Sequence, residues 1–149
     1  MERKYRMYCL AERHLSSIQK AIQSAHAIVE YGQTYGDTPE YKQWADRDKT
    51  IVILDGGRSI DLDSIVDQLR CEGWPFETFY EPDMDNFMTA IAFLVPDTVY
   101  DYEKWGRDYN DYREIEYPGK THYDTWLADI GGKPAEAVKS IISNLRLAI

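Results

Sequence analysis

The chain has 149 residues, 44% of them hydrophobic and 13% aromatic, which is typical of one globular domain and not of a disordered segment. Its net charge of −9 and the lack of any run of Lys or Arg argue against a large DNA or RNA footprint, which needs clustered basic side chains. A small nucleotide needs only a few donors and stays open as a ligand. No charged-then-apolar leader opens the chain and no apolar run approaches the roughly 18 residues of a membrane span. We therefore expect a cytoplasmic protein with neither a membrane nor a DNA partner.

The first third of the chain predicts a strand, a helix and a loop. Residues 6–12 have a strand pattern, and Ser16, followed three residues later by Gln19, matches a capping box that opens a helix. We expect Gly32 to end this helix and the polar residues 33–47 to form a loop. The apolar residues of the helix recur at helical spacing, which predicts that they face the core: Ile18, Ala21, Ile22, Ala25, Ile28 and Val29.

Three more strands and a second helix follow. The β-branched run over residues 49–55 predicts a buried strand, and residues 59–73 show a helical pattern that ends at a glycine. Residues 76–81 and 88–95 predict two further strands. This order of elements favours an α/β fold with a mixed, partly parallel four-stranded sheet flanked by helices.

The last third of the chain has a different character. Residues 97–126 hold six of the twelve tyrosines and two of the four tryptophans, without clean periodicity. This stretch is too aromatic for a solvated tail, so we expect it to pack on the same domain or on a partner subunit. Pro134 suits the first turn of a closing amphipathic helix. We therefore divide the chain into a core over residues 1–96 and an extension over residues 97–149.

The first helix also carries a polar stripe. Gln19, Gln23, His26 and Glu30 recur at spacings of 4, 3 and 4 residues. The helix begins at the carboxyl end of a strand, where α/β sheets bind ligands and free N–H groups attract phosphates. The two amides could bind a ribose or a base edge, and the imidazole could donate to a phosphate or relay a proton. The alternatives are ordinary structural roles: Gln19 closing the capping box, Gln23 solvated, His26 holding a neighbouring strand and Glu30 facing solvent.

Two loops contain further candidates. Glu81, Asp83 and Asp85 are spaced like ligands of a hard cation, but they lack the glycine and distal glutamate of a calcium loop, so we expect no metal. An Asp-Gly-Gly-Arg stretch ends in Arg58 and is either a turn or an anion contact, because it matches no established phosphate loop.

Two of these stretches together resemble the type 2 peptidyl-tRNA hydrolases. Gln23 and His26 match the Gln-x-x-His-Ala motif on the first helix of that family. Glu81 and Thr89 take the acidic position and the threonine position of its second signature. The resemblance implies a peptidyl-tRNA hydrolase type 2-like fold for the core. For Thr89 the alternative is an ordinary β-branched strand residue.

The chain also departs from that family. The family's functional lysine falls on Gln19, and Lys20 lies about 100° further around the helix, outside the polar stripe. Glu12 stands where the family has aspartate. These departures resemble a divergent branch found in bacteria and their phages. If the hydrolase activity is kept, the resemblance implies His26, Gln19 and Glu81 as catalytic residues.

Two functions from different classes follow. We favour a binding module that captures a nucleotide-like small molecule at the start of the first helix, sequestering it without cleavage and without a cofactor. The alternative is an active hydrolase that cleaves the ester between a peptide and the tRNA 3′ end. The related family is typically dimeric, and Tyr and Trp suit interfaces, so we expect a homodimer. The predicted ligand-binding residues are Glu12, Ser16, Gln19, Gln23, His26, Arg58, Glu81, Asp83 and Thr89.

Overall fold

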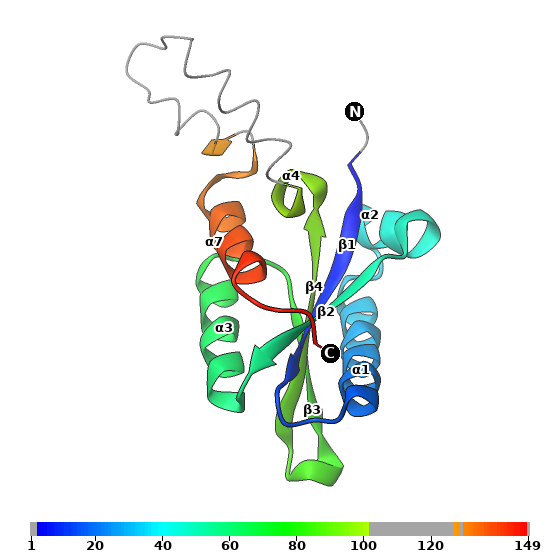
Figure 1. The fold of residues 1–149 in the computed structure, drawn as a ribbon. Helices are drawn as coiled ribbons and strands as arrows, with labels where there is room; N and C mark the ends of the chain where they lie inside the picture. Colours follow the sequence, from blue (N-terminus) through cyan, green and yellow to red (C-terminus); the bar gives the residue numbers. More distant parts are fainter. Residues whose placement is uncertain (1–2, 102–126, 129, 149) are drawn as a thin grey trace.

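The computed structural model describes residues 3–101, 127–128 and 130–148. The elements alternate between strand and helix through the first part of the chain (Figure 1). In chain order they are β1 (Tyr5–Glu12), α1 (Ser17–Tyr35), α2 (Pro39–Gln43), the π-helical turn η1 (Trp44–Asp48), β2 (Ile51–Gly57), α3 (Ser59–Cys71), β3 (Glu77–Glu81), the 3-10 turn η2 (Pro82–Met84), β4 (Phe87–Pro96), α4 (Asp97–Tyr100) and α7 (Gly132–Ser143).

The four strands form one mixed sheet in the order β2-β1-β4-β3. β1 and β2 are parallel, and β4 runs antiparallel to both of its neighbours. The predicted α/β class and mixed four-stranded sheet are confirmed. Ala11 pairs with Asp55 near the end of both parallel strands, so the carboxyl ends of β1 and β2 meet at one edge of the sheet.

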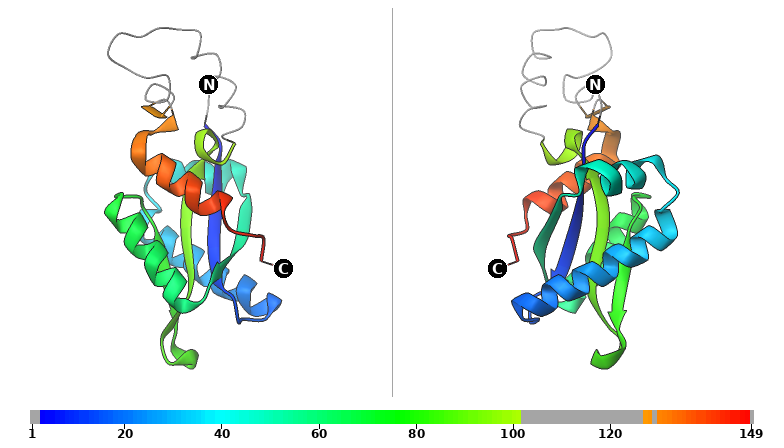
Figure 2. Two further views of the ribbon diagram at one scale, coloured as in Figure 1. Left: turned by 60° about the vertical axis from the view of Figure 1, so that its left-hand side comes forward. Right: turned by 90° about the vertical axis from the view of Figure 1, so that its right-hand side faces the viewer.

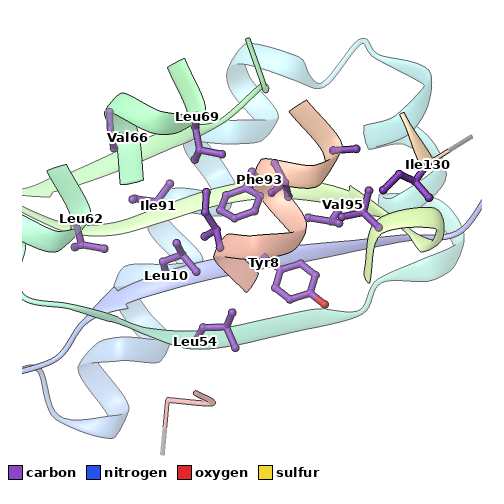
Figure 3. Close-up of a cluster of buried hydrophobic side chains, with 14 of the residues drawn as sticks. Tyr8, Leu10, Leu54, Leu62, Val66, Leu69, Ile91, Phe93, Val95 and Ile130 are labelled. Atoms are coloured by element: carbon purple, nitrogen blue, oxygen red, sulfur yellow. The ribbon is translucent and has the colours of Figure 1, made fainter. Parts of the chain in front are cut away.

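Helices cover both faces of the sheet. α1 lies on one face, and α3 and α7 lie on the other (Figures 1 and 2). Successive strand residues point to opposite faces, so β1 and β4 contribute to two separate cores, and the interior positions of both strands are mostly apolar for that reason. The core under α3 and α7 includes Tyr8, Leu10, Ile91, Phe93 and Val95 (Figure 3). The core under α1 includes Met7, Cys9, Ala27, Tyr31, Ala90 and Ala92.

The segment after α7 returns to the sheet. The backbone N–H of Asp55 donates to the carbonyl of Arg146 over 2.8 Å, and the N–H of Ala148 donates to the carbonyl of Ile53 over 3.0 Å. Residues 146–148 therefore cover part of the open edge of β2, whose unpaired backbone groups would otherwise face solvent. This pairing also brings Arg146 to the carboxyl edge of β1 and β2.

The buried face of α1 is not the predicted one. Ile18 is 72% exposed and Val29 is 58% exposed, and Ile22 is exposed as well. The helix instead buries a mostly small or polar face: Lys20, Gln23, Ser24, Ala27 and Tyr31. The sheet beneath presents Ala90 and Ala92, so small helix residues allow close approach, and the buried amide finds partners on β3 and β4. Hydrophobicity along the helix alone predicted the wrong side.

Substitutions on the exposed and buried faces of α1 should differ in their effect on stability. Ile18→Gln should change the free energy of unfolding by less than about 0.5 kcal/mol, because the side chain already lies in water. Ala27→Leu on the buried face should cost about 1–3 kcal/mol, because the added atoms have no space. Urea denaturation of both variants measures the two changes. The reverse order of the two costs would mean that the exposed face is the packed one.

The predicted end of the first helix and the loop after it are also wrong. α1 continues past Gly32 to Tyr35, and α2 and η1 occupy most of the expected loop. A Cβ atom at Gly32 would lie 2.7 Å from the hydroxyl oxygen of Tyr41. The glycine therefore permits close packing of α2 on α1 and does not terminate the helix.

The aromatic stretch and the predicted absence of a membrane span remain to be compared with the structure. The expected packing of the aromatic stretch falls mostly on residues 102–126, which lie outside the described residues. Within the described residues, no helix combines the length and the apolar character needed to cross a membrane.

Candidate functional site

A buried amide links the first helix to the β3–β4 hairpin. Gln23 is only 1% exposed, and its Nε2 donates to Oε2 of Glu81 over 2.8 Å. The hydroxyl of Thr89 donates to Oε1 of Gln23 over 2.8 Å and also approaches the carbonyl of Phe79 at 3.3 Å. Gln23 Nε2 lies 3.4 Å from Oε1 of Gln19, one turn earlier on α1. The structure thus brings together four of the predicted site residues in one network.

Glu81 is a partly exposed member of this network. The hydrogen bond from Gln23 holds the pKa of its carboxyl below the ordinary value, and the backbone N–H of Asp83, 3.2 Å from Oε1, acts in the same direction. Partial burial opposes this shift, and nearby His26 adds a smaller lowering effect. Glu81 is therefore a carboxylate at neutral pH, with both oxygens already accepting hydrogen bonds.

His26 lies one turn after Gln23 on α1 and is exposed to solvent. Its ring stacks on Phe79 with centroids 4.6 Å apart and an angle of 20° between the planes. The residue is exposed, so the stacking fixes the ring while leaving it accessible to solvent. An imidazole in this position can contact a ligand that reaches the end of β3.

The lowered pKa of Glu81 predicts how stability depends on pH. Its contribution should be fully present above pH 4.5, the ordinary carboxyl value, and should be lost as the pH falls through the lower pKa of the folded state. Glu81→Gln should therefore lie below the wild type in unfolding free energy at neutral pH and approach it in acid. Urea unfolding from about pH 7 to about pH 3 tests this. A gap between the two proteins that does not narrow in acid would contradict it.

Two further predicted residues, Ser16 and Glu12, accept hydrogen bonds from backbone N–H groups around the start of α1. The hydroxyl of Ser16 accepts from the backbone N–H of Gln19 over 3.1 Å, which makes it the N-cap of α1. Glu12 accepts from the backbone N–H of His14 over 2.8 Å, and its other oxygen lies 2.6 Å from the ring Nδ1 of that residue. Glu12 and Thr89 also line a small pocket of about 220 Å³ beside Ser59.

The Asp-Gly-Gly-Arg stretch forms the entry to α3. The backbone N–H of Arg58 donates to Asp61 over 2.8 Å, and its side-chain Nε lies 3.5 Å from the same carboxylate. Gly57 adopts φ +85°, a conformation that most side chains avoid. These features describe a helix-capping turn. Within the described residues, Glu81, Asp83 and Asp85 do not form a metal-binding group, and no other cluster of His, Cys, Asp and Glu does so.

Lys20, predicted to lie outside the polar stripe, belongs to a second candidate site. It lies on the buried face of α1 and is only 8% exposed. Its side chain lines a cavity of about 690 Å³ at the carboxyl ends of β1 and β2. The other lining residues come from the loop after β1, from β2 and from the segment after α7: Arg13, Asp55, Arg146, Leu147 and Ala148.

The charges in this cavity are unbalanced. Asp55 is already engaged, since Arg13 Nε lies 3.4 Å from its Oδ2 and the N–H of Gly57 donates to its Oδ1 over 2.9 Å. Among the described residues, neither Lys20 nor Arg146 has a carboxylate within salt-bridge distance of its side chain. The cavity is therefore cationic in a protein whose net charge is −9.

The sequence contained a partial signal for Lys20. Lys20, Ser24, Ala27 and Tyr31 repeat the spacing of 4, 3 and 4 residues that marked the polar stripe, displaced by one position. Lys20 does leave the stripe, as predicted, but it turns toward the sheet. No local pattern could have added Arg146, because only the pairing of residues 146–148 with β2 brings it to the cavity.

A comparison with models of known protein families and a search of curated proteins both give no match to this chain.

Proposed function

We propose that this protein is a binding module for a small phosphorylated, nucleotide-like ligand, which occupies the cavity at the N-terminal end of α1. One observation carries the proposal: Lys20 is 92% buried, faces a large cavity and has no anionic partner among the described residues. Removing a cation from water without a partner costs about several kcal/mol. A bound anion would supply the missing partner.

The lining chemistry supports a phosphate ligand. A guanidinium can bind two phosphate oxygens at once, and a lysine adds a point charge, so Arg13, Lys20 and Arg146 form a suitable set. Asp55, held by Arg13, offers an acceptor for a ribose hydroxyl or a base amino group.

The position and size of the cavity support the same ligand class. In open α/β sheets, ligands bind outside the carboxyl ends of the strands, and this cavity lies at the carboxyl ends of β1 and β2. Its volume of about 690 Å³ is within the range of small-molecule sites. The start of α1 also contributes the positive end of its helix dipole.

The proposal is tested by a ligand series in which only the charge varies. Calorimetric titration with ATP, AMP, inorganic phosphate and adenosine should show binding that strengthens with phosphate charge and weakens as salt is added. Adenosine should bind at least about tenfold more weakly than AMP. Equal affinity for AMP and adenosine, or no binding by any phosphate compound, would overturn the proposal.

A peptidyl-tRNA hydrolase is the second candidate. The network of Gln23, Glu81 and Thr89 favours it, because these are the residues that the resemblance to that family implicates. The lowered pKa of Glu81 opposes it, since a carboxylate stabilised in this way is a weaker general base. A cleavage assay on peptidyl-tRNA separates the two candidates: robust hydrolysis that is lost in Glu81→Gln would establish the enzyme over the binding module.

A further inference from the structure

A second pocket lies at the opposite end of the sheet. It has a volume of about 280 Å³ and is lined by residues from the start of β1, the end of β4, the last turns of α1, the start of α2 and the segment before β3. Four aromatic residues contribute to the lining: Tyr5, Tyr31, Tyr35 and Trp74. The Lys20 cavity lies at the other end of β1, and the two sites have no described lining residue in common.

The aromatic walls are fixed by their own hydrogen bonds. The indole N–H of Trp74 donates to the carbonyl of Leu94 over 3.1 Å, and the hydroxyl of Tyr35 lies 3.4 Å from the carbonyl of Phe76. The rings of Tyr31 and Tyr35 pack with their centroids 4.7 Å apart. Because the polar atoms of Trp74 and Tyr35 are already used, these residues offer the pocket mainly ring surface.

One carboxylate supplies the charge of the pocket. Glu40 lines it, and among the described residues no cation lies within salt-bridge distance of its carboxylate. Burial raises the pKa of Tyr5 first and Glu40 raises it further, while Arg3 acts in the opposite direction. Burial and then neighbouring Tyr35 and Glu40 raise the pKa of Tyr31. The phenols are therefore neutral, and the field of Glu40 reaches both of these walls.

We propose that this pocket binds a small organic cation that carries N-methyl groups, such as a trimethylammonium group. The negative faces of aromatic rings attract a cation, and the methyl groups can bury against the rings and Leu94. Glu40 balances the positive charge at the pocket. A phosphate would be repelled by the same carboxylate, and a metal ion would lack ligands, because Glu40 is the only carboxylate among the described residues of the lining. A neutral apolar ligand would gain nothing from the charge.

The test compares ligands of the same shape and different charge. In calorimetric titrations, choline should bind at least about tenfold more tightly than 3,3-dimethylbutan-1-ol, which replaces its charged nitrogen with carbon. A short peptide with trimethyllysine, beside the same peptide unmodified, distinguishes a protein-borne group from a free one. Tighter binding of either methylated probe than of its own control, the neutral analogue or the unmodified peptide, supports the site. Equal affinity for choline and its neutral analogue, or no binding by both methylated probes, overturns it.

Three variants test whether choline binds in this pocket. Glu40→Gln removes the charge at an exposed position and should weaken choline binding about tenfold. Tyr35→Leu keeps apolar bulk but removes the aromatic face and should weaken binding by a similar factor. Asp63→Asn, on the exposed side of α3, makes the same change in net charge elsewhere and should bind like the wild type. Unchanged binding in Glu40→Gln would overturn the proposal, as would equal losses in Glu40→Gln and Asp63→Asn.

Discussion

Replacing Lys20 with methionine should stabilise the protein and remove most of its affinity for phosphate compounds. Methionine keeps the length of the side chain but ends the burial of an unpaired cation, so the free energy of unfolding should rise by about 1 kcal/mol or more. A charge-assisted hydrogen bond is worth about 1.5–3 kcal/mol, so AMP binding should weaken roughly 10- to 100-fold. Urea denaturation and calorimetric titration measure the two effects on the same samples.

A rise in the free energy of unfolding together with a loss of AMP affinity would distinguish a ligand-binding lysine from a structural one. Lys42→Met on the exposed surface of α2 removes the same charge away from the cavity and should leave both quantities nearly unchanged. If Lys20→Met instead lowers stability by more than about 1 kcal/mol, the lysine has a structural role and the proposed function fails.

Gln23→Leu should be strongly destabilising, although it puts an apolar residue of similar volume in a buried position. The change removes the donor to Glu81 and the acceptor for Thr89, and each such loss costs about 1–3 kcal/mol when the group left behind is buried. Glu81 can turn to water and Thr89 retains the carbonyl of Phe79, so we expect a total of about 2 kcal/mol. Chemical denaturation measures this cost.

A double-mutant cycle shows whether the loss belongs to the network. Combining Gln23→Leu with Thr89→Val should cost less than the sum of the single changes by about 1 kcal/mol, because both remove the same hydrogen bond. Gln33→Leu, at an exposed position of the same helix, should be close to neutral. Strict additivity, or an equal cost at Gln33, would show that the hydrogen bonds of Gln23 contribute little to stability.

The candidate site was only partly accessible to sequence reasoning. The resemblance to a known family singled out Gln23, Glu81 and Thr89, and these residues do lie in one hydrogen-bonded network. It did not single out Lys20, because that family's lysine falls on the preceding position. Arg58 was a candidate anion contact by its place after two glycines, and in the structure its partner is Asp61 on its own helix turn.

The sequence by itself determined the strands, the two main helices of the core and the α/β class. These follow from local sequence patterns, such as the mostly apolar runs that form β2 and β4, because each pattern lies within one short segment of the chain. Only the tertiary structure decided which side of α1 is buried and which charges meet at the edge of the sheet. Which face of a helix is buried depends on the shape and the hydrogen-bonding groups of the surface beneath it. For α1 these are the alanines of β4 and the carboxylate of Glu81. The cationic cavity joins side chains from opposite ends of the chain, which meet only after β2 pairs with residues 146–148.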